Sequence, residues 1–150
     1  MTRSAPTARE LRTIYRMAPI PEEGGYFALG PRTTGLSCIT ALLTDEPAGF
    51  SALHVLTVDE GWQWLAGSPI DLVTLDVSGT GTRHTLDAST PQVLVPAGTW
   101  QGAMPRGPWS LLACWCAPAF TDGVFRLGIR EELVLAYPGW ATDIERLTRG

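Results

Sequence analysis

The chain has 150 residues, of which 45% are hydrophobic and 17% charged, a balance typical of one globular domain with a single core. Its net charge is -4 at pH 7 and its basic residues form no cluster, which argues against nucleic-acid and membrane-surface partners. Cys38, Cys114 and Cys116 lack a CxxC spacing, so they predict neither a disulfide framework nor a zinc knuckle. The sequence has no secretory signal pattern and no run long enough to span a membrane. We therefore expect a reduced, soluble, cytoplasmic protein.

A short helix is predicted first, over residues 8–17. Thr7 and Glu10 have the spacing of a capping box, and the apolar residues that follow recur at helical spacing. Two prolines then end the helix. The Gly24–Gly25 pair allows a sharp turn into the first strand, which begins near Tyr26.

Short strands punctuated by Gly, Pro and Asp occupy residues 24–120. One hairpin is clear in "IDLVTLDVSGTGTRHTLD", with its turn at residues 78–81. Regular short strands of this kind indicate a sandwich or a barrel. The tail over residues 121–150 has helical character, and no composition change marks a domain boundary, so we predict one all-β domain over residues 1–150.

The stretch "SALHVLTVDEGWQWLAG", residues 51–67, reads as one or two strands and contains one of the two histidines of the chain. Strand alternation puts six of its side chains on one face: His54, Leu56, Val58, Glu60, Trp62 and Trp64. A face with large apolar walls and two ionisable groups suits a ligand pocket. The alternatives are a buried histidine satisfied by Glu60 or a carbonyl, and tryptophans that only fill the core.

The same stretch resembles the first cupin motif, because His54, Glu60 and Gly67 fall at the motif's histidine, glutamate and glycine positions. Leu56 replaces the second histidine. "VPAGTWQGA" resembles the second cupin motif, although Gln101 stands in place of its histidine.

The fuller pattern resembles one branch, the small single-domain cupins called cupin-5, described as of unknown function. Six of that branch's motifs occur in order: "PIPEEGGYF", "LHV", "DEGW", "GSP", "PQVLVPAGTWQ" and "APAF". Leu53, Val55 and Ile20 replace a tryptophan, an arginine and a histidine of the branch, so the neighbourhood is more apolar here. The resemblance implies a double-stranded β-helix, or jelly-roll, barrel with a short N-terminal helix and a helical C-terminal tail. It also implies a homodimer, because barrels of this size commonly pair through open sheet edges.

Most cupins hold a divalent metal with three histidines and a carboxylate. This chain keeps His54 and Glu60 but has no second histidine at motif spacing, and His84 follows a hairpin turn. We therefore expect no metal cofactor; the alternative is an ion such as Fe or Ni held through His54 and Glu60.

A pocket that holds no metal can still catalyse a reaction by acid–base chemistry. We predict His54, Glu60 and Tyr26 as catalytic residues. The predicted substrate-binding residues are Leu56, Trp62, Trp64, Gln92, Trp100 and Gln101. The tryptophans offer flat faces, and the glutamine amides can hydrogen-bond a substrate carbonyl.

The motifs supply no cationic residue for a phosphate, so we expect a small neutral or hydrophobic substrate. The predicted function is that of an isomerase, lyase (dehydratase) or cyclase. We expect this activity to belong to the biosynthesis of specialised metabolites. Two alternatives stay open: a metal-dependent cupin oxygenase, and a small-molecule-binding cupin without catalysis.

Overall fold

The structure is a computed structural model that describes residues 3–150. The prediction of one domain over residues 1–150 therefore includes two residues outside the described part. Within residues 3–150, no helix has the length and apolar character needed to cross a bilayer.

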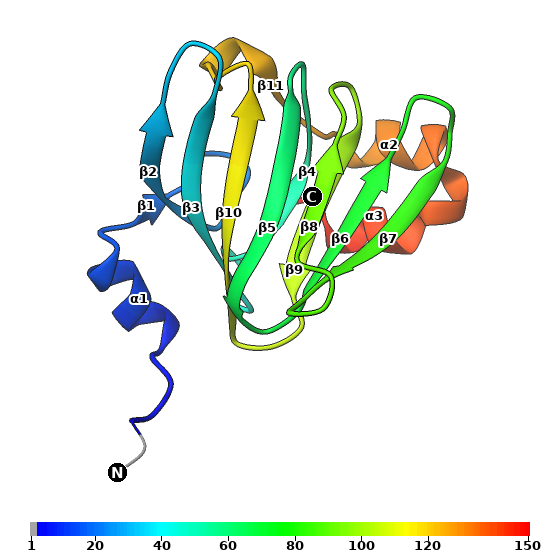
Figure 1. Cartoon of the computed structure of the whole chain (residues 1–150). Coiled ribbons are helices and arrows are strands. Elements are labelled where there is room, and N and C mark those ends of the chain that lie inside the picture. Colours follow the sequence, from blue (N-terminus) through cyan, green and yellow to red (C-terminus); the bar gives the residue numbers. More distant parts are fainter. Residues whose placement is uncertain (1–2) are drawn as a thin grey trace.

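Two antiparallel sheets face each other (Figure 1), as the strand pattern predicts. Sheet I contains, in spatial order, β1 (Ala18–Pro19), β2 (Tyr26–Arg32), β3 (Ser37–Thr44), β10 (Trp109–Ala117), β5 (Asp59–Gly67) and β8 (Gln92–Val95). Sheet II contains β11 (Phe125–Leu127), β4 (Ser51–Leu56), β9 (Trp100–Pro105), β6 (Ile70–Leu75) and β7 (Gly81–Leu86). The predicted hairpin is β6–β7, paired from Ile70↔Leu86 to Leu75↔Gly81.

Helix α1 (Ala8–Ile14) begins at the predicted capping box, in which the Thr7 hydroxyl accepts from Glu10 N–H and the Glu10 carboxylate accepts from Thr7 N–H. The helix packs through Leu11 against a cluster that contains Leu42 and Leu111. The indole of Trp109 donates to the Pro6 carbonyl at 3.0 Å. These contacts hold α1 against sheet I.

The C-terminal tail is helical, as predicted, and consists of α2 (Arg130–Ala136), η2 (Pro138–Trp140) and α3 (Ala141–Arg146). These helices cover the outer face of sheet II (Figure 1). Leu133, Ile144 and Leu147 pack there against Leu53 and Val73. Sheet II is therefore apolar on both faces, which explains why β4 is buried along most of its length instead of alternating.

The stretch 51–67 corrects the expectation that one strand face carries its key side chains. It forms two strands, β4 and β5, which belong to opposite sheets. His54 and Leu56 project from sheet II, whereas Glu60 and Trp62 project from sheet I, and all four are buried. The turn between the strands lets them face each other across the interior.

Candidate functional site

A cavity of about 540 Å³ lies between the two sheets, a volume within the ordinary range for small-molecule sites. It is bounded by strands of both sheets, by the segment 20–25 before β2, and by the loop between β10 and β11. Most of its wall is apolar and includes Ile20, Phe27, Ile39, Leu56, Phe120 and Phe125. The side chains of Glu23, His54 and Glu60 reach this apolar space from the segment 20–25, from β4 and from β5.

His54 lines the cavity and is only 2% exposed. Its Nδ1 lies 2.7 Å from the carbonyl oxygen of Ala52, and since a carbonyl only accepts, Nδ1 carries a proton and donates it. The ring also stacks on Phe125 with centroids 5.3 Å apart. These two contacts fix the imidazole and leave Nε2 as its reactive nitrogen.

Glu23 supplies the carboxylate nearest to that nitrogen. Its Oε1 lies 3.5 Å from His54 Nε2, and its Oε2 accepts a hydrogen bond from the Ser51 hydroxyl at 2.7 Å. Ser51 is fully buried, so the carboxylate is anchored from the sheet side. Glu23 comes from the segment 20–25, not from a strand.

The backbone of Glu23 is held from two directions. Its carbonyl accepts from the Ala52 N–H at 2.9 Å and from the Arg149 guanidinium at 2.5 Å. Arg149 also donates to the Phe50 carbonyl at 3.0 Å. Gly24 follows with φ +98°, and a Cβ there would collide with Phe50 and Arg149, so this position needs glycine.

Glu60 is the second carboxylate in the cavity and is 8% exposed. Its Oε2 accepts from the Cys116 thiol, a weak donor, at 3.4 Å. Burial raises the pKa of Glu60 to about 7, although the nearby His54 imidazole opposes that rise. This carboxyl can therefore exchange a proton near neutral pH.

All three cysteines line the cavity. Burial raises the pKa of the Cys114 and Cys116 thiols, and the Glu60 carboxyl adds to both shifts. Both groups therefore stay protonated, and they serve as small apolar wall residues rather than nucleophiles.

The structure brings together three of the predicted site residues, His54, Leu56 and Glu60, in one cavity. Trp62 and Gln101 lie deeper between the sheets. The Trp62 indole donates to the Gln101 side-chain carbonyl at 2.6 Å, and both residues are almost fully buried. They therefore bond to each other and form packed interior instead of cavity wall.

Three further predicted substrate-binding residues lie away from the cavity. Trp64 packs against the interior cluster and donates to the Ser68 carbonyl at 3.0 Å. Gln92 is exposed on β8 at the edge of sheet I. Trp100 packs under the C-terminal helices, because Gln101 next to it points inward and successive residues of a strand face opposite sides.

Tyr26 is also outside the cavity. It is buried in the cluster beneath α1, and the Arg12 guanidinium lies 3.9 Å from its ring centre. Alternation along β2 places Phe27, the next residue, in the cavity wall instead.

Sequence reasoning missed Glu23 as a site residue. It lies in "PIPEEGGYF", a segment interpreted only as a turn and a family motif. The available signal was a carboxylate directly before a glycine pair. Nothing local in the sequence shows that this segment crosses beside β4.

The residues of this cavity do not fit the metal that the cupin resemblance implies. A non-haem iron site uses two histidines and one carboxylate, but His54 is the only histidine on the wall. Among residues 3–150, no three His, Cys, Asp or Glu side chains form a group suited to a metal ion. The alternative of an ion held through His54 and Glu60 gains no further donor from the structure, and we derive no step through a metal.

A family model described as "Cupin superfamily (DUF985)" matches residues 9–128. A hypothetical protein from Leishmania major has the same fold with a TM-score of 0.86 and 23% identity, covering 97% of this chain and 100% of that one. A protein from Shewanella oneidensis gives a TM-score of 0.86 with 28% identity, covering 97% and 99%. Oxalate decarboxylase from Bacillus subtilis gives 0.61 with 12% identity, covering 87% of this chain and 37% of the enzyme. No curated protein matches the sequence significantly.

Proposed function

This chain belongs to the cupin superfamily, in the family Cupin_5 (DUF985), and on that premise we propose that it is a metal-independent cupin that performs acid–base chemistry on a small hydrophobic organic substrate. One observation carries this proposal: an imidazole with a fixed tautomer and a carboxyl that titrates near pH 7 line one apolar cavity. Groups that titrate near the working pH are the most efficient proton carriers.

His54 has the role of base through Nε2. Because Nδ1 is held by Ala52, only Nε2 can take a proton from a substrate carbon or hydroxyl. The resulting imidazolium is stabilised by the Glu23 carboxylate, 3.5 Å away. Ser51 keeps that carboxylate in place.

Glu60 has the role of acid. In its protonated form it donates to a carbonyl or a departing hydroxyl, and it returns to that form by taking a proton from solvent or from the imidazolium. Proton transfer from one substrate atom to another gives an isomerase. Loss of the protonated hydroxyl as water gives a dehydratase, and attack by an internal nucleophile gives a cyclase.

The apolar walls support a largely hydrophobic substrate, because burying a polar body against Phe27, Leu56 and Phe125 without hydrogen bonds is unfavourable. The oxalate decarboxylase and the KdgF protein of Halomonas share the fold at 12% and 15% identity, so neither supplies a substrate for this chain. A homodimer, a cytoplasmic location and a place in specialised metabolism stay predictions.

The test is a comparison of three proteins incubated with small-molecule extracts and followed by mass spectrometry. The native protein should convert a compound into an isomer or into a product lighter by one water. His54→Ala and Glu60→Gln should each lower that rate by about 10²–10⁴-fold while the fold, judged by circular dichroism, survives.

Unchanged turnover in both variants would refute the acid–base proposal. Elemental analysis of untagged protein decides the alternative: stoichiometric iron, nickel or manganese would favour an oxygenase. Tight retention of a compound that is never converted would favour a binding protein.

A further inference from the structure

The charges on the cavity wall are unbalanced. Glu23 and Glu60 lie inside, and Glu22 and Asp122 line the exposed part of the wall. The cationic side chains on the same wall are the exposed Arg32 and, when protonated, His54. Acidic groups therefore outnumber basic ones around a space that is otherwise apolar.

Glu60 is the most deeply buried of these acids. It is more than nine-tenths buried, and its hydrogen-bond donor is the weak Cys116 thiol at 3.4 Å. The Trp62 indole lies close enough to lower the pKa of Glu60 slightly, but it donates to Gln101 at 2.6 Å. A buried carboxylate whose donors are weak or already used needs a cation or a proton, and the cavity leaves room for either.

The aromatic wall suits a cation as well. Phe27, Phe120 and Phe125 come from three different segments and all contribute to the lining. The face of a phenyl ring attracts an ammonium group, and more strongly where water is excluded. An anionic ligand would instead be repelled by both interior carboxylates.

We infer that the ligand of this cavity carries a protonated amine on an apolar body, with the ammonium group received by Glu60 and the body packed against the phenylalanines. This inference rests on the proposed function and deepens it by naming the substrate class. The ionised Glu60 binds the ammonium group, and by taking a proton from it gives a neutral amine and the protonated carboxyl that the proposed function uses as its acid. An ammonium group has three donors, which suits the free acceptor sites of the Glu60 carboxylate and of Glu23 Oε1.

The binding should depend on pH. The groups that face Glu60 are His54 from β4, Glu23 from the segment 20–25, and Cys114 and Cys116 from β10. The cysteines stay protonated, so the pH dependence comes from the Glu60 carboxyl, whose pKa of about 7 lies within the range tested. As pH rises from 5.5 to 8, Glu60 loses its proton and becomes negative, and the affinity for an ammonium ion should increase.

The test uses three probes with one aromatic skeleton: phenethylamine, 2-phenylethanol and 3-phenylpropanoate. Equilibrium binding is measured by chemical-shift titration of the His54 imidazole and tryptophan indole signals. At pH 8 the amine should bind about tenfold more tightly than the alcohol, and the carboxylate should bind most weakly. At pH 5.5 the amine's advantage should fall to about threefold or less.

Glu60→Gln keeps the shape of the side chain and removes its charge, so it should abolish the amine's advantage at pH 8. Asp59→Asn is the matched control, because Asp59 is on the same strand and its exposed side chain accepts from the Ala97 N–H at 2.8 Å. That control should keep the tenfold preference. A thermal melt of each variant shows that it is folded.

Equal or tighter binding of the alcohol or the carboxylate at pH 8 would overturn the inference, and so would the absence of binding by all three probes. An undiminished preference for the amine in Glu60→Gln would overturn it too. These measurements involve no turnover. The two proposals can therefore fail separately. If His54→Ala were fully active but the amine preference were observed, the acid–base proposal alone would fail. If His54→Ala were inactive but no amine preference were observed, the amine inference alone would fail.

Discussion

The interior between the two sheets has a filled region and a hollow region, and both are lined by inward-facing strand residues. In the filled region Trp62, Leu72 and Leu112 are almost completely buried and pack in one cluster. In the hollow region His54, Glu60 and Leu56 border a cavity of about 540 Å³. Trp62 and Glu60 are two residues apart on β5, so one strand contributes to both.

Inward orientation alone therefore does not make a site. In the filled region the Trp62 indole donates to the Gln101 side-chain carbonyl across the sheets. The hollow region has the weakly satisfied carboxyl of Glu60 and the open nitrogen of His54. We expect stability to depend mainly on the first region and chemistry on the second.

The largest effect on stability should come from Trp62→Ala. The substitution removes a large buried side chain and leaves the Gln101 carbonyl without its donor, so the free energy of unfolding should fall by about 3–5 kcal/mol. Chemical denaturation monitored by far-UV circular dichroism measures this loss of unfolding free energy.

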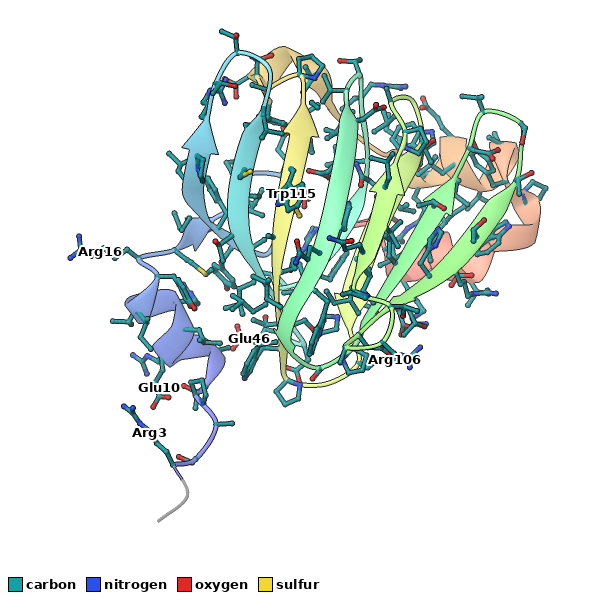
Figure 2. All side chains as sticks on the ribbon, in the orientation of Figure 1. Arg3, Glu10, Arg16, Glu46, Arg106 and Trp115 are labelled. Carbon is teal, nitrogen blue, oxygen red and sulfur yellow. The ribbon has the colours of Figure 1, made fainter. Side chains whose placement is uncertain are left out.

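Trp115→Ala is the control for the Trp62→Ala substitution. Trp115 is on the neighbouring strand β10, where it is 43% exposed (Figure 2). Its removal should change the free energy of unfolding by less than about 1 kcal/mol. Equal losses in the two variants would contradict the distinction between the filled interior and the outer face of sheet I.

The second-largest effect should be a dependence of the free energy of unfolding on pH, which arises from the ionisation of Glu60. Its pKa is about 7 in the folded protein, raised by burial from the ordinary value of 4.5. Between these values the folded state binds more protons than the unfolded state, so stability falls as pH rises from 4.5 through 7. The loss amounts to about 3 kcal/mol at most.

Glu60→Gln should remove that decline. The variant should match the native protein near pH 4.5 and exceed it in free energy of unfolding at pH 8, as measured by urea unfolding across the range. A native protein whose stability falls no more steeply than that of the variant would show that Glu60 is not titrating in the folded state as described.

The smallest effect concerns the segment that closes the hollow region. Arg149→Gln removes hydrogen bonds to the carbonyls of Glu23 and Phe50, which should cost about 1 kcal/mol. Because Glu23 contacts His54, the imidazole NMR signal should also shift and broaden.

Arg146→Gln serves as the comparison, since Arg146 is in the same tail but donates to the sulfur of Met104 at 3.0 Å. It should leave the His54 signal unchanged. An unchanged signal in Arg149→Gln as well would indicate that Arg149 does not position Glu23.

Much of the fold could be predicted from the sequence. The capping box at Thr7, the β6–β7 hairpin and the helical tail all follow from local patterns, and the structure confirms them. The motif spacing at His54 and Glu60 indicated two residues that do line one cavity. Tyr26 and Trp100 lie outside the cavity because their neighbours Phe27 and Gln101 point inward, and neighbouring residues of a strand face opposite sides.

Periodicity and motif spacing are local properties of the chain, so the all-β class, the family and the central imidazole and carboxyl could be inferred from the amino-acid order alone. The placement of β4 and β5 in opposite sheets, the bond from Trp62 to Gln101 and the approach of Glu23 to His54 became visible in the folded structure. The physical reason is that these contacts join segments about 30 to 40 residues apart. Their geometry depends on how the sheets pack and on which side chains fill the space between them.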